Sequence, residues 1–147
     1  MILSTQEVER KAKQALTKIK PKTIIKANQL AQHLLKRILK DLPLKFTVKG
    51  RSNLIVSEKT MDDLIVEFLE FFFYNKDFPK QKDNEIFLYE KITDQELEYY
   101  ARKNNLKFKP NKKDKKISEL IENLARKYPD TKYGLLSSFK KLQNKIK

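Results

Sequence analysis

The segment Met61–Tyr74, MDDLIVEFLEFFFY, constrains the fold more than any other part of the chain, because it is the most apolar stretch. Ten of its fourteen residues are apolar or aromatic, and at helical spacing they point in nearly every direction. A helix that is apolar all round must be covered by neighbouring elements. Thr60 is expected to cap this helix, with Asp63 as the acid of a capping box. We therefore expect the rest of the chain to pack around it.

The charge of the chain is large and unevenly distributed. The 147 residues include 33 Lys and Arg against 19 Asp and Glu, a net charge of +14. Residues 1–50 carry +9, residues 51–100 carry −6 and residues 101–147 carry +11. This excess is greater than solubility requires, and it favours a polyanionic partner such as RNA.

The length predicts a single domain, 1–147, because the chain is too short for two independent cores. Within it we expect a basic helical part at 1–50, an α/β core at 51–108 and a basic helical part at 109–147.

Several residue types are too scarce for whole classes of chemistry. The absence of cysteine excludes disulfides and thiolate sites, and a single histidine, His33, excludes a histidine metal cluster. Two glycines exclude a glycine-rich phosphate loop. No run is long enough for a membrane span and no signal sequence is visible, so we expect a cytoplasmic protein without a membrane partner. We expect no cofactor, with ATP and Mg²⁺ left open.

Apolar periodicity and capping residues predict six helices, at 5–19, 23–40, 61–74, 94–104, 116–127 and 132–146. The β-prone runs 46–48 and 54–57 either pair as a hairpin or include only one strand, at 54–57, which we favour. Residues 85–90, EIFLYE, are predicted to form a further strand. The fold class is therefore predicted to be helix-rich α/β, with a small parallel sheet of two to three strands around the buried helix.

Three stretches between 57 and 142 resemble the C-terminal half of the tRNA 2-thiolation enzymes, members of the PP-loop (adenine nucleotide α-hydrolase-like) superfamily of ATP pyrophosphatases. The family's Gly-His-Asn/Thr-x-Asp-Asp signature is similar to Glu58, Lys59, Thr60, Met61, Asp62 and Asp63. A second family pattern resembles Phe87, Leu88, Ile92, Glu96, Tyr100 and Ala101. The family's C-terminal pattern is similar to Tyr128, Pro129, Asp130, Thr131, Lys132, Leu136, Ser138 and Leu142.

The resemblance implies a fold and a connection to tRNA modification, while the departures from it argue against catalysis. Enzymes of that family hold ATP on an SGGxDS loop and adenylate a tRNA base before sulfur replaces its oxygen. This chain has no such loop, and its start is expected to lie beyond the loop's place. It also lacks the cysteines that the family uses for zinc, cluster or sulfur chemistry, and the position near Pro110 where such a pair would fall is rich in lysine. The chain is therefore expected to be a shortened, degenerate relative that binds RNA, with Lys59, Thr60, Asp62 and Asp63 as a residual motif.

Basic and aromatic residues towards the C-terminus form the predicted nucleic-acid-binding surface. Its residues are Lys107, Lys109, Lys112, Lys113, Lys115, Lys116, Arg126, Lys127, Lys132, Tyr133, Lys140 and Lys141. Such a density of cations attracts phosphates in a salt-dependent way, and Tyr133 or Phe108 could stack on unpaired bases unless it packs in the core. A second basic surface is predicted from Lys11, Lys13, Lys18, Lys20, Lys22 and Lys26.

Two other functions fit the sequence. The protein could be an interaction subunit or homodimer with general affinity for DNA and RNA, its central helix partly covered by a partner. It could also be a Mg²⁺-dependent nuclease in which Asp62, with Asp63 or Glu58, holds the ion and Lys59 assists. We favour a non-catalytic RNA-binding protein, with tRNA as its partner.

Overall fold

The computed structural model describes residues 3–16, 19, 23–40 and 42–146. The chain divides into two compact units. Unit 1 comprises Met1–Thr60 and Gln81–Pro110, and unit 2 comprises Met61–Lys80 and Asn111–Lys147. Whether the two act as the single predicted domain stays a prediction, and each unit is described by itself.

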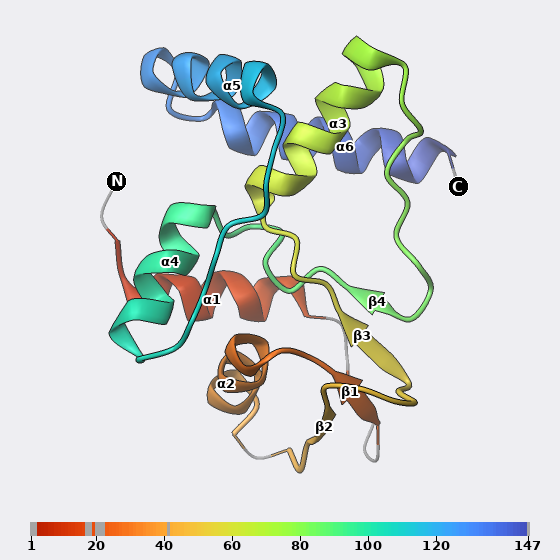
Figure 1. Cartoon of the computed structure of the whole chain (residues 1–147), viewed down its shortest axis with the longest axis vertical. Helices are drawn as coiled ribbons and strands as arrows, with labels where there is room; N and C mark the ends of the chain where they lie inside the picture. The colour runs from red at the N-terminus through yellow and green to blue at the C-terminus, as the bar shows by residue number, and fades with distance from the viewer. Residues whose placement is uncertain (1–2, 17–18, 20–22, 41, 147) are drawn as a thin grey trace. The chain divides into compact units, whose positions relative to one another are not determined.

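Unit 1 contains a four-stranded parallel sheet (Figure 1). Its strands are β1 (Ile24–Lys26), β2 (Lys45–Thr47), β3 (Leu54–Val56) and β4 (Glu85–Ile86). They lie in the order β2-β1-β3-β4, and each neighbouring pair is parallel. The helix-rich α/β class is therefore confirmed, with one more strand than the two to three expected.

The strand assignments need three corrections. Both predicted alternatives for 46–48 and 54–57 are wrong: the two runs do not pair as a hairpin, and each contributes a strand, since β2 and β3 flank β1 on opposite sides. The predicted helix at 23–40 is wrong in its first turn, because Ile24–Lys26 pairs with β2 and β3. The predicted strand at 85–90 ends at Ile86, since turns follow in which the N–H groups of Glu90 and Ile92 donate to the carbonyls of Phe87 and Tyr89.

Three helices pack on one face of this sheet: α1 (Thr5–Ala15), α2 (Gln29–Ile38) and α4 (Asp94–Lys103). Each begins at a side chain that accepts a backbone N–H. Ser4 caps α1, Asn28 caps α2, and Thr93 with Glu96 forms a full capping box at α4. The first helix ends at Ala15 rather than at 19, because Leu16 is extended.

An ion pair in the interior of unit 1 joins α1 to α4. Lys11 Nζ lies 2.9 and 2.7 Å from the two carboxylate oxygens of Glu96, and both side chains are buried. Glu96 also accepts the N–H of Thr93 at 3.1 Å. A lysine predicted to face RNA is thus part of the packing of unit 1.

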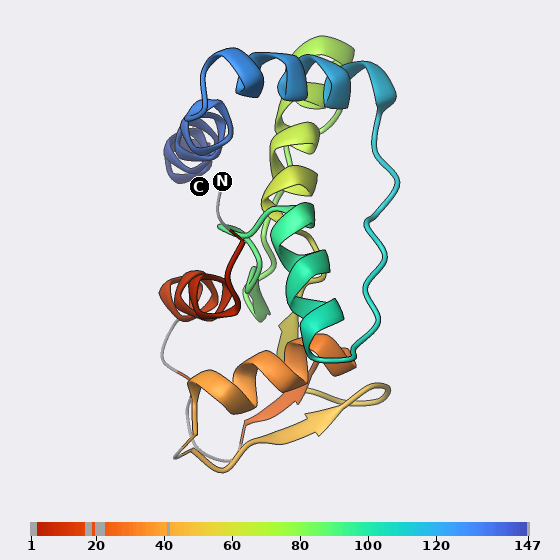
Figure 2. The ribbon, with the colours of Figure 1, turned by 90° about the vertical axis from the view of Figure 1, so that its left-hand side faces the viewer.

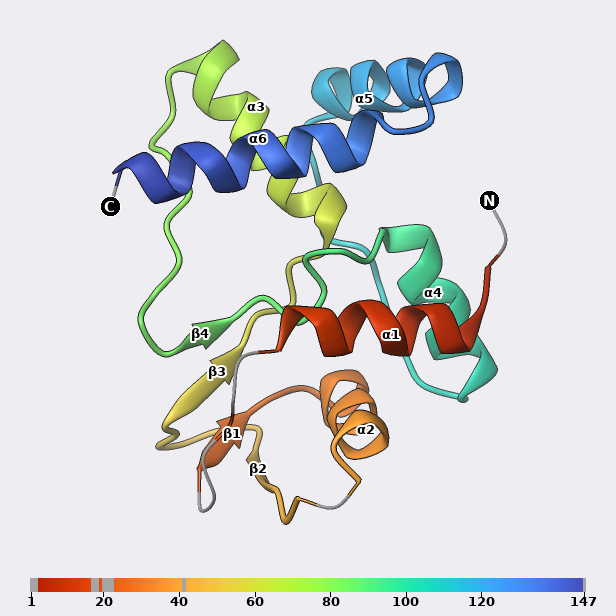
Figure 3. The same ribbon diagram turned by 180° about the vertical axis from the view of Figure 1, so that it is seen from behind.

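Unit 2 consists of α3 (Met61–Tyr74), α5 (Lys115–Lys127) and α6 (Thr131–Ile146), with the connectors at 75–80 and 111–114. Figure 3 shows α6 running across α3. Phe68 of α3 packs edge-on against Phe139 of α6, with ring centroids 5.5 Å apart, and Phe78 stacks on Phe139 at the same separation. An aromatic cluster therefore forms the core of this unit.

The predicted bounds of α3 are confirmed, but its burial is confirmed only in part. Met61, Leu64 and Ile65 are fully buried. At the other end, Phe72 and Phe73 are each 56% exposed and Tyr74 is 43% exposed. The helix is therefore apolar all round but covered mainly along its first two turns.

Replacement of Lys11 by Met is predicted to destabilise the protein strongly. It would leave the Glu96 carboxylate buried without its cation, which costs about 3–5 kcal/mol. Chemical denaturation would measure the free energy of unfolding. Arg10→Met is the matched control, because the neighbouring Arg10 pairs with Glu7 at the surface and should lose less than about 1 kcal/mol. Equal small losses in both variants would contradict the buried pair.

Candidate nucleic-acid interface

The predicted basic surface continues from an extended segment into α5. Asp114 caps this helix by accepting the N–H of Ile117 at 2.9 Å. Ile117 and Ile121 form its buried face. In unit 2 the exposed cations of the predicted surface are Lys112, Lys115, Lys116, Arg126, Lys127 and Lys141. Lys140 is half-buried, and Lys107 and Lys109 are exposed in unit 1.

Two other lysines of the predicted surface are engaged by the acid pair at the start of α3. Lys113 Nζ lies 3.0 Å from Asp63 Oδ1, and Asn111 Nδ2 donates to Asp63 Oδ2 at 2.9 Å. Lys132 Nζ lies 2.7 Å from Asp62 Oδ1 and 2.8 Å from Glu122 Oε1. The two lysine side chains are only 13% and 16% exposed. We therefore assign them a structural role, and RNA contact by either stays a prediction.

The electrostatics of Lys132 fit this role. Burial by itself would lower the pKa of its ammonium group, but the charges and hydrogen bonds of Asp62 and Glu122 outweigh burial and raise the pKa above its usual value. Lys132 therefore stays charged at neutral pH and links α6 to both α3 and α5.

Residues of the residual motif form hydrogen bonds and ion pairs within their own units. Thr60 Oγ1 donates to Asp94 Oδ1 at 2.6 Å, and the N–H of the half-buried Lys59 donates to Ser57 Oγ at 3.2 Å. A Mg²⁺ ion at Asp62 and Asp63 would have to displace two ammonium groups. Among the described residues, no group of three or more His, Cys, Asp or Glu could hold a metal ion. The nuclease alternative therefore gains no support from the geometry.

Two exposed tyrosines lie among the cations around the α5–α6 turn. Tyr133 is 46% exposed, as base stacking requires. Tyr128, at the C-terminal end of α5, is 64% exposed and was not among the predicted site residues. The sequence signal that could have identified it is its place between Lys127 and the turn at Pro129. Phe108 packs against the core of unit 1, as the core alternative expected.

The second predicted basic surface is only partly described. Lys11 is buried in its pair with Glu96, while Lys13 and Lys26 are exposed. Lys18, Lys20 and Lys22 lie outside the described residues. The structure therefore leaves Lys13 and Lys26 as the described exposed cations of this set.

A further candidate site lies at the carboxyl ends of β1 and β3. The chain leaves β1 towards one edge of the sheet and β3 towards the other, so the two strands flank the switch point where open α/β sheets bind ligands. Only Ala27 and Asn28 separate β1 from α2. Asn28 accepts the N–H of Ala31 at 2.8 Å and donates through Nδ2 to Glu58 Oε1, beyond β3, at 2.6 Å.

The residues at this switch point do not fit ATP. A phosphate-binding junction needs close backbone approach and N–H groups that are free to donate. Here the junction has no glycine, the N–H of Ala31 is bonded to Asn28, and the N–H of Ala27 donates to the carbonyl of Thr47 at 3.2 Å. The carboxylate of Glu58, held next to the junction, would repel a phosphate.

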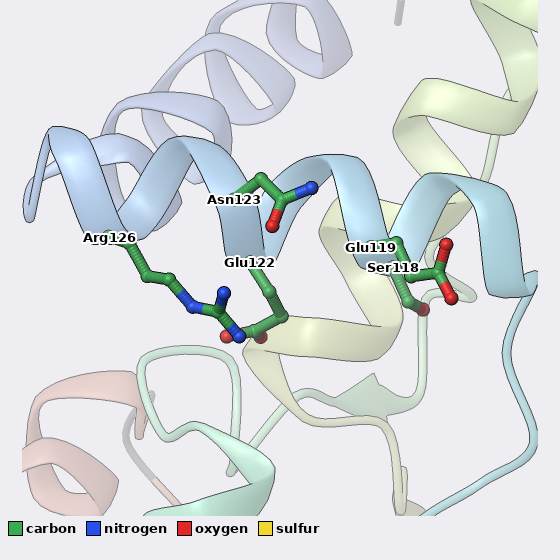
Figure 4. Close-up of a pocket in the computed structure, with 5 residues that line it drawn as sticks. All are labelled: Ser118, Glu119, Glu122, Asn123 and Arg126. Carbon is green, nitrogen blue, oxygen red and sulfur yellow. The ribbon is translucent and has the colours of Figure 1, made fainter.

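Side chains along α5 line a hollow (Figure 4). It is lined by Ser118, Glu119, Glu122, Asn123 and Arg126. Because Glu122 is already paired with Lys132, we assign no ligand to this hollow.

Replacement of Lys132 by Met is predicted to destabilise the protein by about 2 kcal/mol or more, because Asp62 would lose its buried cation. Lys141→Met, an exposed change on the same helix, should stay within about 0.5 kcal/mol. Urea denaturation of both variants would measure the difference. A Lys132→Met protein as stable as the control would show that Asp62 does not need this lysine.

Comparison with known proteins identifies the fold. No family of known proteins matches the sequence, and no curated protein matches it. Among solved structures, the chain is similar to the U34-tRNA thiolase NcsA from Methanococcus maripaludis with its [4Fe-4S] cluster, with a TM-score of 0.74 at 14% sequence identity. The similarity covers 97% of this chain and 79% of that chain, so it includes the first strand and helix as well as 57–142. The resemblance to tRNA 2-thiolation enzymes is therefore confirmed as a resemblance of fold: this chain shares the fold of that U34-tRNA thiolase.

Proposed function

We propose that the protein binds RNA, with tRNA as its main partner, and acts in tRNA modification without catalysing adenylation or sulfur transfer. The observation that carries the proposal is the fold, which matches a tRNA thiolase over 97% of the chain. A fold alone does not determine function, so the chemistry of the described residues must support each part.

The non-catalytic part is supported by the residues that would hold cofactors. The β1–α2 junction suits a triphosphate poorly, because it has no glycine, the N–H groups of Ala27 and Ala31 are engaged, and the Glu58 carboxylate lies beside it. A [4Fe-4S] cluster, present in the similar thiolase, needs mainly thiolate ligands, and this chain has no cysteine.

The RNA-binding part is supported by the exposed cations. Lysines predominate among them, and lysine acts as a point charge that suits phosphates better than base edges. Tyr128 and Tyr133 add exposed rings near the α5–α6 turn, on which unpaired bases could stack. We therefore propose recognition of RNA through its backbone and unpaired bases.

One observation favours a second candidate function, the interaction subunit. Phe72, Phe73 and Tyr74 form an exposed aromatic end of α3. Nearby, Glu70 pairs with Lys76, which also lies over the Tyr74 ring, so this end is aromatic rather than basic and suits RNA poorly. A protein partner is the alternative, and self-association without RNA binding would support it.

Exposed lysines at the start and end of α5 are predicted to contribute to RNA affinity. In the α5 variant, Lys112, Lys115, Lys116 and Lys127 are changed to Gln. Fluorescence anisotropy with folded tRNA, single-stranded RNA and duplex DNA would measure affinity at several salt concentrations. The slope of log affinity against log salt should fall in magnitude by about 3, since each lost single-strand phosphate contact contributes about 0.7.

The helix-side variant is the matched control, with four exposed cations of unit 1 changed to Gln: Lys36, Lys40, Arg102 and Lys103. It loses the same charge from α4, from α2 and from the segment just after α2, and it should change the slope less. Tighter binding to tRNA that persists near physiological salt would support the tRNA assignment. Equal affinity for all three nucleic acids that disappears as salt is added would show that the protein binds polyanions in general rather than tRNA.

The protein is predicted not to bind ATP at the switch point. Titration of the protein with ATP and Mg²⁺ in a calorimeter should give no saturable heat at millimolar nucleotide. Glu58→Gln removes the repelling charge but leaves the short junction, so it should not create a site either. Saturable binding that Asn28→Asp abolishes would contradict the proposal that the chain is non-catalytic.

A further inference from the structure

The strands of unit 1 present two faces of different chemistry. Paired residues in neighbouring strands point to the same side, and residues alternate along each strand. The register places one set on the face that packs with α1, α2 and α4: Ile25, Phe46, Leu54, Val56 and Ile86. The alternate set lies on the second face: Ile24, Lys26, Lys45, Thr47 and Ile55, with Glu85 at the β4 edge.

The second face has the pattern of a surface that faces solvent or a polar partner. Parallel strands that are covered on both faces are apolar along their whole length. Here β1 alternates between exposed and buried residues, with Lys26 exposed, and Lys45 of β2, which pairs with Ile24, is exposed too. Figure 2 views unit 1 from the helix side, with α1, α2 and α4 gathered on that side of the strands. None of these three described helices covers the second face.

The connection between β2 and β3 places two more cations beside this face. Asn53 donates its N–H to the carbonyl of Ile24 at 2.9 Å and accepts the N–H of Ile24 at 3.0 Å. Thr47 Oγ1 donates to the carbonyl of Lys49, and Gly50 has a φ of 103°, a value that glycine adopts without strain. Lys49 and Arg51 are therefore carried on a loop that is fixed to the start of β1.

We call Lys26, Lys45, Lys49 and Arg51 the strand-side basic surface. All four side chains are exposed. Among the residues that the structure describes, no acid forms an ion pair with any of them. Lys113 and Lys132, which the sequence pointed to, are by contrast paired with acids.

We propose that the strand-side basic surface binds the phosphate backbone of RNA. The inference rests on the RNA binding proposed above and places it on unit 1, apart from the lysines around α5. Unit 1 carries 20 Lys and Arg against 10 Asp and Glu, so its charge as a whole favours an anionic ligand. Phosphate contacts need cations at the surface and no base-specific geometry.

The composition of this face argues against a protein occupant. A docked helix would need a continuous apolar area, whereas Ile24 and Val48 are the large apolar side chains that the described residues of β1, β2 and the β2–β3 connection expose. A second copy of the same face would bring eight cations together, which like-charge repulsion disfavours. An anionic backbone satisfies the four cations directly.

The test compares four proteins in the tRNA anisotropy assay: the parent, the α5 variant, the helix-side variant and a strand-side variant with Lys26, Lys45, Lys49 and Arg51 changed to Gln. Each variant loses four charges. The strand-side variant should lose tenfold or more in affinity at 0.1 M salt, and its salt slope should fall by about 3. The helix-side variant should change by less than about threefold. Circular dichroism would verify that all three variants fold.

The outcomes separate this inference from the proposed function. If the parent binds tRNA and only the α5 variant is weakened, the strand-side surface is excluded and the proposed function stands. If the parent binds no RNA, both fail. Equal losses in the strand-side and helix-side variants would reduce the effect to net charge and overturn the inference. So would a strand-side variant that keeps RNA affinity but loses binding to phosphatidylserine vesicles.

Discussion

Neutralisation of the acid pair at the start of α3 is the constraint on which unit 2 depends. Asp62 and Asp63 are buried, and a buried carboxylate without a cation costs several kcal/mol. Lys132 neutralises Asp62 and also reaches Glu122 on α5, while Lys113 neutralises Asp63. One charge cluster thus joins α3, α5, α6 and the segment before α5. The same cluster withdraws two lysines from the surface that would attract RNA.

In unit 1 the corresponding constraint is the position of β1 between β2 and β3. Its buried Ile25 lies in the core, while Lys26 on the opposite side remains exposed. The junction to α2 is so short that its polar groups bond to one another and to Glu58. The same arrangement therefore places a carboxylate at the switch point of the sheet and leaves exposed lysines on its second face.

The long periodic elements could be predicted from the sequence, and the short strands only in part: those at 54–57 and 85–90 were expected, while β1 and β2 were not. Met61–Tyr74 and the helix capped by Thr93 have strong local signals, and both form as expected. Ile24 and Ile25 fall within the helix predicted at 23–40, because a strand of three residues is too short for its two-residue period to be told from the 3.6-residue period of a helix. The ion pairs of Lys113 and Lys132 join residues about 50 and 70 positions apart, so no local pattern reveals them. Periodicity also could not show that neighbouring elements leave the end of α3 exposed from Phe72 onward.

The relation between fold and function in this chain follows from what the sequence lacks. The chain shares the fold of a tRNA thiolase at 14% identity, although it has only two glycines, too few for a glycine-rich phosphate loop, and no cysteine to bind a cluster. Cofactor sites need particular atoms at particular places, and a few substitutions remove them. A surface that binds phosphates needs only cations at suitable spacing, so it tolerates extensive change in sequence. A surface that binds RNA can therefore exist on this fold without cofactor sites. Under the proposed function, the exposed lysines of both units are the residues on which RNA affinity would depend.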